Sequence, residues 1–163
     1  YDGATWQSVG GGTQIGQVVS TNKTDTFSTT STSYTDITGL SVSITPTLAT
    51  SKVLVMVSFS ASVSTDIAVM FQLVRGSTAI NIGDAAGSRT RASASMITNA
   101  DTTQFGTFNW QYLDSPATTS ATTYKVQMFV NAGTGFINRT GSDTDTATRP
   151  RTPANITVME VIV

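Results

Sequence analysis

Short segments in which apolar and polar residues alternate recur along the sequence, and this alternation constrains the fold more than any other feature. Segment 40–44 reads LSVSI, and segment 123–130 reads TYKVQMFV. A period of two residues places every second side chain on the same face of a β-strand, so that one face is buried. About eight to ten such segments follow one another between turn signals, and none has the length and period of an amphipathic helix. The sequence therefore predicts an all-β fold, a sandwich or jelly roll of antiparallel strands.

The composition favours the same fold. About 50 of the 163 residues are Thr or Ser, whereas Glu occurs once and Lys three times. Thr suits the pleated surface of a sheet and Ser suits turns, while Glu and Lys are surface residues that favour helices. Hydrophobic residues make up 39% of the chain, which argues against a disordered Ser/Thr-rich stalk. We expect residues 13–163 to form one domain, and residues 1–12, which end in three glycines, to connect it to an upstream segment.

Several classes of function are excluded by residues that the sequence lacks. It contains neither His nor Cys, which removes Ser-His-Asp triads, cysteine nucleophiles and the usual zinc, haem and iron–sulfur ligand sets. The net charge of −1 gives no field that would attract nucleic acid or an anionic membrane surface. No apolar run approaches the roughly 18 residues that a membrane span requires. We therefore expect neither nucleic-acid binding nor membrane insertion.

Two predicted strands are apolar on both faces. In each strand, one face carries an apolar set that suits the core, and the opposite face carries a second apolar set. The second set consists of Leu54 and Met56 in segment 53–63, and of Met159, Val161 and Val163 in segment 155–163. Burying one set inside a sandwich leaves the other exposed on a monomer, and exposed apolar patches usually mark interfaces. These five residues predict a closed homo-oligomer, with a cyclic trimer favoured. The alternative is that a loop of the same chain covers the second set.

The order of segments resembles the C-terminal domains of phage tail-fibre and related virion structural proteins, particularly those of marine and cyanobacterial viruses. The similarity covers most of residues 13–163. The matching segments are 14–19 (QIGQVV), 40–46 (LSVSITP), 51–55 (SKVLV), 112–116 (YLDSP), 123–127 (TYKVQ), 137–140 (INRT) and 156–161 (ITVMEV). The resemblance implies a homotrimeric, tumour-necrosis-factor-like jelly roll at the distal end of a fibre, outside the cell and part of the virion. It also implies that residues 1–12 follow an upstream fibre repeat.

Recognition of a host glycan or protein is expected on loops, because loops display polar groups on a rigid scaffold. The candidate loops are 83–91, 99–103 and 133–153. Their candidate receptor-binding residues are Asp84, Arg89, Arg91, Asp101, Phe136, Asn138, Arg139, Arg149 and Arg151. Segment 149–151 also fits a structural crossing into the last strand. A second hypothesis is a capsid decoration or head-fibre protein, in which the oligomer matters and the loops bind nothing.

Enzymatic and metal-binding roles are weaker interpretations of the same loops. Asp84, Asp101, Asp143 and Asp145 lie in predicted loops, but their spacing does not match the paired carboxylates of glycosidases, so we expect no catalysis. Asp143 and Asp145 are the candidates for Ca²⁺, although two carboxylates are too few for its six to eight oxygen ligands. The alternative is a solvated turn, and we expect no cofactor.

Two further residues carry expectations about the interior. Trp110 alternates with Phe108 and Tyr112, which favours a place in the core or an interface over a sugar-binding platform. Glu160, the single Glu, shares a face with Ile156 and other core residues, where an unpaired carboxylate is costly. We expect it to pair with Lys52 or with an arginine.

Overall fold

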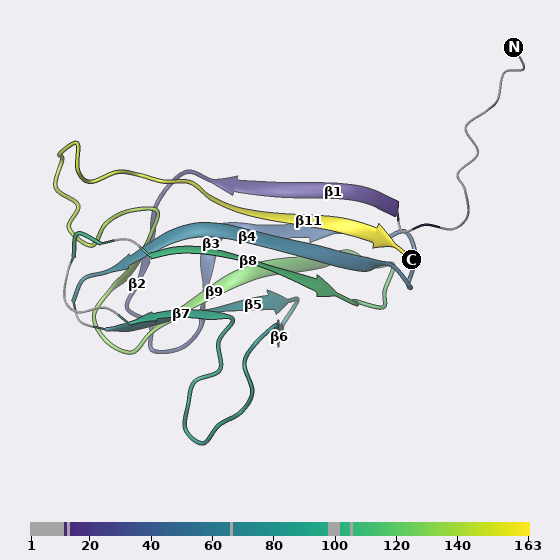
Figure 1. Ribbon diagram of the computed structural model, residues 1–163, viewed down its shortest axis with the longest axis horizontal. Coiled ribbons are helices and arrows are strands. Elements are labelled where there is room, and N and C mark those ends of the chain that lie inside the picture. The colour runs from purple at the N-terminus through teal and green to yellow at the C-terminus, as the bar shows by residue number, and fades with distance from the viewer. Residues whose placement is uncertain (1–11, 13, 66, 98–101, 105) are drawn as a thin grey trace, which may run out of the picture.

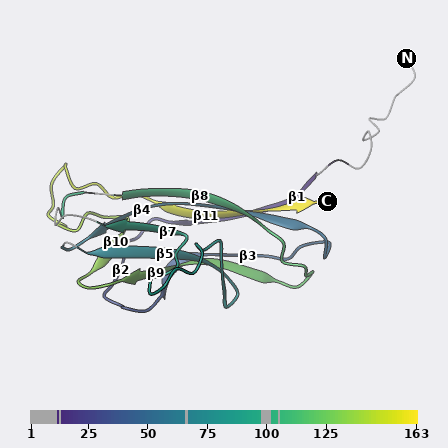
Figure 2. The same cartoon turned by 60° about the horizontal axis from the view of Figure 1, so that its bottom comes forward.

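Two antiparallel β-sheets pack face to face in the computed structural model (Figures 1 and 2), which describes residues 12, 14–65, 67–97, 102–104 and 106–163. The described residues contain strands and connecting segments and no helix, which confirms the predicted all-β sandwich. The strands are β1 (Gln14–Lys23), β2 (Phe27–Thr29), β3 (Thr35–Ile44), β4 (Lys52–Val63), β5 (Ala68–Arg75), β6 (Thr78–Ile80), β7 (Ala94–Ile97), β8 (Gly106–Asp114), β9 (Thr122–Val130), β10 (Gly135–Ile137) and β11 (Ala154–Ile162). The predicted connector, residues 1–12, lies outside the described residues except for Gly12.

The first sheet is organised around β4, its longest strand. On one side β4 pairs with β8, and on the other side it pairs first with β11 and then with β10. β1 extends the sheet beyond β11, and β2 extends it beyond β10. The second sheet has the order β3-β9-β5, and β6 and β7 pair with successive parts of β5. The two sheets enclose one hydrophobic core.

The core follows the two-residue period of the sequence. Along β4, Val53, Val55 and Val57 are at most 3% exposed, whereas the alternating residues are only partly buried. Phe59 lies at the centre, with its ring 4.7 Å from that of Phe71 in the second sheet. Alternation therefore predicted correctly which side chains of this strand enter the core.

Strand β10 was not predicted, because segment 131–153 was expected to be a long polar connection. Its three residues are all buried, and they pair with β2 on one side and with β4 on the other. A Cβ atom at Gly135 would collide with the side chain of Met128, so the close approach requires glycine here. Three residues are too few to display an alternating pattern, and the adjacent Phe136 and Ile137 were the only signal.

The strand pairing defines two ends of the sandwich. At one end, Gln14 at the start of β1 pairs with Ile162 at the end of β11. At the other end, Lys23 pairs with Ala154, the residue that follows the long β10–β11 loop, residues 138–153. Figure 1 shows this loop at the left and the C-terminus at the right. The β10–β11 loop therefore lies at the end opposite to the entry of β1 and the exit of β11.

Candidate binding site

The predicted receptor-binding residues separate into two places. Asp84, Arg89 and Arg91 belong to the β6–β7 loop, residues 81–93, which projects downward in Figure 1. Phe136 lies on β10. The β10–β11 loop carries the other predicted residues, Asn138, Arg139, Arg149 and Arg151. Asp101 lies outside the described residues. The structure thus offers two separate candidate surfaces instead of one.

The β6–β7 loop is closed at its base and exposed along its tip. The Arg91 side chain donates from Nε to the carbonyl oxygen of Gly83 at 2.6 Å, and the Tyr34 hydroxyl donates to the carbonyl oxygen of Arg91 at 2.8 Å. Asp84 and Arg89 are exposed, and among the described residues the Arg89 side chain contacts only its own turn, through a 3.4 Å bond from Nη1 to the carbonyl oxygen of Ala86. The arginine at the base is therefore structural, and the tip presents isolated charges without a formed site.

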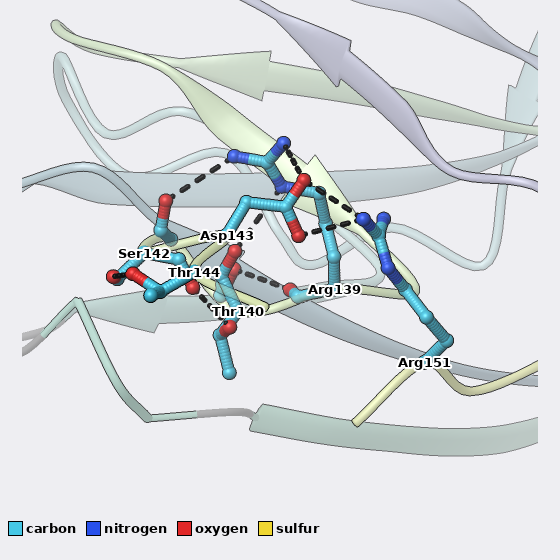
Figure 3. A network of polar contacts seen from close by, with 8 residues as sticks. Arg139, Thr140, Ser142, Asp143, Thr144 and Arg151 are labelled. Carbon is cyan, nitrogen blue, oxygen red and sulfur yellow. Dashed lines mark hydrogen bonds and ion pairs between the residues drawn. The ribbon is translucent and has the colours of Figure 1, made fainter. Parts of the chain in front are cut away.

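A network of charges organises the β10–β11 loop (Figure 3). The Asp143 carboxylate lies between two guanidinium groups: Arg139 Nη1 is 2.9 Å from Oδ2, and Arg151 Nη2 is 2.7 Å from Oδ1 and 2.8 Å from Oδ2. Charge-assisted bonds of this kind are stronger than neutral ones, because both partners are ionised. Asp143 therefore joins the start of the loop to the segment that leads into β11.

Arg139 is engaged on every side. Its guanidinium lies 4.0 Å from the centre of the Phe136 ring, and its Nε and Nη2 atoms donate to the carbonyl oxygens of Thr140 and Gly141 at 3.1 and 3.2 Å. A Cβ atom at Gly141 would collide with the carbonyl oxygen of Val63, so the loop passes directly over the end of β4. Arg139 thus holds the loop in shape, which limits what it can offer to a ligand.

Two of the candidates are not accessible. Phe136 is 8% exposed and Asn138 is fully buried, which contradicts their assignment to a receptor-binding surface. Asn138 adopts a φ of 64°, and its side-chain amide donates to the carbonyl oxygens of Lys23 and Asp25 at 3.1 and 3.0 Å. An asparagine tolerates this left-handed backbone better than most residues. Its role is to join the β10–β11 loop to the turn after β1, where the Lys23 ammonium also pairs with Asp25 at 2.8 Å.

A hollow of about 240 Å³ lies on the exposed side of the loop. It is lined by Asp143, Thr144, Asp145, Thr146, Arg149 and Arg151. In the described part of the chain, the Nε atom of Arg149 is buried and has no hydrogen-bond partner, while its Nη1 contacts Thr148 at 3.3 Å. Among the same residues, the exposed carboxylate of Asp145 has no ion pair. The hollow is therefore lined by a cation, Arg149, and a carboxylate, Asp145, that form no ion pair within the described residues.

The main chain of segment 149–151 is also structural, as the alternative interpretation expected. The amide of Arg149 closes a turn to the carbonyl oxygen of Thr146 at 3.1 Å, and that of Thr152 donates to the carbonyl oxygen of Asn138 at 3.3 Å. The crossing into β11 and the hollow therefore use the same segment.

The loop does not suit a calcium ion. Both carboxylate oxygens of Asp143 are bound by arginines, and a cation there would have to displace two guanidinium groups. No cluster of three or more potential metal-binding side chains occurs among the described residues. Asp145 alone is too few ligands for Ca²⁺, which takes about six to eight oxygens.

The predicted assembly residues lie together on the outer face of the first sheet. Leu54 and Met159 are register partners, and the same row continues to Val18 of β1 and Leu113 of β8. Val18 is 54% exposed and Leu113 is 46% exposed. These four apolar side chains cross four neighbouring strands, and we name the row they form the apolar row.

Neighbouring positions extend the apolar row toward the end of the sheet where β11 terminates. Val161 pairs with Ile15, which is 55% exposed, and Val163 is 59% exposed. On the other side of the row, Met56 pairs with Gln111 and leads into a polar region of Ser and Asn side chains. A second hollow, of about 400 Å³, lies there and is lined by Met56, Val57, Ser58, Asn109, Trp110, Gln111 and Asn155.

The sequence missed Ile15, Val18 and Leu113 as members of this surface. Ile15 and Val18 belong to β1 and Leu113 to β8, but the alternation within one strand does not reveal which residues of another strand lie beside it. The register supplies that information, and the sequence does not encode it in any short pattern.

Trp110 lies in the core layer, as its alternation indicated. Its ring meets that of Phe59 edge to face at 5.5 Å, and it packs against the buried core. Its indole nitrogen is buried and unpaired within the described part of the chain.

The partner predicted for Glu160 is wrong. Glu160 is fully buried, and instead of a cation it binds neutral donors: the Thr47 amide and hydroxyl at 2.6 and 2.7 Å, and the Gln17 amide at 3.0 Å. Burial raises the pKa of the Glu160 carboxyl, but the hydrogen bonds from Gln17 and Thr47 outweigh it and lower the pKa to about 2. A bulge in β1 brings Gly16 against this carboxylate, where a Cβ atom would lie only 2.9 Å from Oε2.

A second buried carboxylate joins the two sheets. Asp114 of β8 receives bonds of 2.8 Å from Arg75 of β5 to both its oxygens, and one of 2.7 Å from the hydroxyl of Tyr124 of β9. Burial, together with the bond to Asp114, raises the pKa of the Tyr124 hydroxyl far above its ordinary value. This group lies near the end of the sandwich opposite to the β10–β11 loop and serves the fold.

No protein-family model matches the chain, and no curated protein matches it. None of the described segments forms a helix long and apolar enough to cross a membrane.

Proposed function

We propose that the chain is a non-enzymatic attachment module of a virus particle, the homotrimeric distal domain of a tail fibre. In this proposal the β10–β11 loop binds a glycan or protein on the host cell surface, and the first sheet holds the trimer together. The viral setting and the threefold symmetry rest on the resemblance of the sequence to tail-fibre domains. One observation carries the binding role: at the end of the sandwich opposite to the start of β1, the β10–β11 loop forms a hollow lined by Arg149 and Asp145, two charged side chains without an ion pair within the described residues.

The position of the hollow supports attachment. β1 begins and β11 ends at the opposite end of the sandwich, where Gln14 pairs with Ile162. Any segment joined to either strand there leaves the β10–β11 loop pointing away from it. A distal module has this arrangement, because the end that joins the rest of the fibre and the end that contacts the host lie opposite each other.

The outer face of the first sheet supports self-assembly. Lys52 is the only charged residue among the described outward-facing positions of β1, β4, β8 and β11. Four strands about 4.8 Å apart and roughly nine residues long present on the order of 600 Å² in projection. A stable interface buries about 800 Å² per partner, so this face is close to the required size. A ring of three copies suits this face, because different parts of the same uncharged surface then pack against the two neighbouring copies around the axis.

The test combines solution mass with adsorption to host cells. Light scattering of residues 1–163 should give the mass of three chains. Arg149→Gln and Asp145→Asn should abolish adsorption while leaving that mass unchanged, because both side chains line the hollow and neither belongs to the apolar row. The matched controls are Arg89→Gln and Asp84→Asn on the tip of the β6–β7 loop, which make the same charge changes elsewhere. A monomer, or loss of adsorption only in the controls, would overturn the proposal.

A capsid decoration or head-fibre protein without receptor binding is the second candidate. The closed network around Asp143 favours it, because Arg139 and Arg151 are already satisfied within the loop. This alternative requires the trimer but predicts that the variants of the hollow adsorb, or fail to adsorb, as the unmodified chain does.

A further inference from the structure

The hollow beside the β10–β11 loop has one donor and one acceptor that the protein does not use. Asp143 is fully occupied by Arg139 and Arg151, so it shapes the hollow without being available to a ligand. The Arg149 guanidinium lines the hollow and, within the described residues, forms no ion pair; its Nη1 contacts only the neighbouring Thr148, at 3.3 Å. A cation that its own chain leaves without a counter-charge is available to a group in the hollow. Asp145 lines the same hollow and pairs with no cation within the described residues.

These two charges select the chemistry of the ligand. An anion attracted by Arg149 is repelled by the Asp145 carboxylate, and a cation meets the reverse conflict. A hydroxyl group both donates and accepts, so two adjacent hydroxyls satisfy the carboxylate and the guanidinium together. Thr144 and Thr146 line the hollow as well and add hydroxyls that accept or donate.

The size of the hollow limits the ligand to one ring. Its volume of about 240 Å³ is below the roughly 300–1,000 Å³ of sites for drug-sized molecules. A single saccharide residue that carries neighbouring hydroxyls meets both the chemical and the spatial requirement.

We propose that this hollow binds a neutral saccharide ring through a pair of adjacent hydroxyl groups, with Asp145 accepting from one and Arg149 donating to the other. The inference rests on the proposed attachment function and specifies its ligand class. Three hollows in a trimer would bind a repeating polysaccharide through avidity, so a weak contact at each one is sufficient.

The test measures binding of free sugars to the full chain by ligand-observed NMR and calorimetry. The probes are methyl glycosides of neutral hexoses with vicinal hydroxyls, and the corresponding methyl uronates, which add a carboxylate. The neutral glycosides should bind better than the uronates. Asp145→Asn and Arg149→Gln should each weaken that binding about tenfold, because each replaces a charge-assisted hydrogen bond with a weaker neutral one. Asp84→Asn and Arg89→Gln should leave it unchanged.

The outcomes separate this inference from the proposed function. If a uronate binds more tightly and Asp145→Asn strengthens it, the hollow is an anion site and the inference is wrong. If no glycoside binds although the chain still adsorbs to cells through the loop, the inference fails and the attachment function stands. Binding of neutral glycosides without adsorption supports the sugar site and contradicts attachment. Thermal unfolding of each variant verifies its fold, and Asp145→Asn decides the test if Arg149→Gln is unstable.

Discussion

The outer faces of the two sheets differ in their side chains: an ion pair and polar cross-strand pairs lie on the second sheet, whereas four apolar residues cross the first, beside a hydroxyl pair between Ser20 and Thr157 at 2.8 Å. On the second sheet, Lys125 pairs with Asp36 at 2.7 Å, and the Gln127 amide donates to the same carboxylate at 2.6 Å. Farther along the same pair of strands, the hydroxyls of Ser43 and Thr123 are 2.7 Å apart. Cross-strand polar pairs of this kind stabilise a sheet that faces water.

On the first sheet, the corresponding surface carries the apolar row. Val18, Met159, Leu54 and Leu113 meet in register across four strands, and none of them gains a polar partner. Both sheets bury their inner faces in one core, so the difference does not concern folding. In the proposed trimer the apolar row is the surface that neighbouring copies cover, whereas the polar pairs of the second sheet stay in water. The predictions below test this comparison, beginning with the largest effect.

A charge in the apolar row should dissociate the proposed trimer. Leu54→Asp places a carboxylate at the centre of the row, where a second copy would bury it without a partner. We expect the solution mass to fall from three chains to one, measured by light scattering. Thr123→Asp introduces the same charge on the second sheet and should leave the mass unchanged. A monomeric unmodified chain would show that both outer faces tolerate water.

Removing the carboxylate that joins the two sheets should cost the most stability. Asp114→Ala leaves the Arg75 guanidinium and the Tyr124 hydroxyl without their acceptor. We expect the free energy of unfolding in urea to fall by about 3 kcal/mol, the lower part of the range for broken buried pairs, because Arg75 is partly exposed. Asp114→Asn keeps an acceptor and should cost less. A loss below about 1 kcal/mol would mean that the sheets are joined by apolar packing alone.

Acid should destabilise the protein through the first sheet. The pKa of Glu160 falls from 4.5 to about 2 on folding, so its stabilising effect is complete above pH 4.5 and is lost as the pH falls toward 2. The loss down to pH 2 should be on the order of 3 kcal/mol, because the fall of the pKa from 4.5 to about 2 is worth about 1.4 kcal/mol per pKa unit and a small part of the effect remains at pH 2. Unfolding measured across this pH range should show a steep decline that Glu160→Gln flattens. An unchanged decline in the variant would assign it to other carboxyls.

The exposed carboxylate of the second sheet should matter least. The hydrogen bond from Lys125 lowers the pKa of Asp36, but the side chain is half exposed and water screens the pair. We expect Asp36→Asn to reduce the free energy of unfolding by roughly 0.2–1 kcal/mol, and less in high salt. Denaturation at two salt concentrations measures both values. A cost equal to that of the Glu160 substitution would remove the contrast between a buried and an exposed carboxylate.

Much of the fold was predictable, because the signal is local. Alternation along β4 and β11 assigned Val53 and Ile156 to the core and Leu54 and Met159 to the opposite face, and their burial agrees. The features that were not predicted depend on contacts between segments that are distant in the sequence. β10 is too short to alternate, and the partners of Glu160 come from β1 and from the turn before β4.

The candidate site was predictable as a region but not as a set of atoms. The excess of arginine and aspartate between Asn131 and Pro153 drew attention to the loop that forms the hollow. Composition does not distinguish Arg139, which is bound on all sides, from Arg149, which keeps an unpaired nitrogen. Nor does it reveal that Asn138 is buried, because that depends on a left-handed backbone and on two carbonyl oxygens after β1.

The closed base of the β6–β7 loop has a consequence for variation and for engineering. The amide of Gly83 donates to the carbonyl oxygen of Ala92, and the Arg91 side chain returns to Gly83, so residues 84–90 form an appendage that the sandwich does not need. Exposed loop tips of this kind tolerate insertion and replacement. A foreign peptide or a fluorescent tag placed between residues 84 and 90 should leave the core, the apolar row and the hollow of the β10–β11 loop intact.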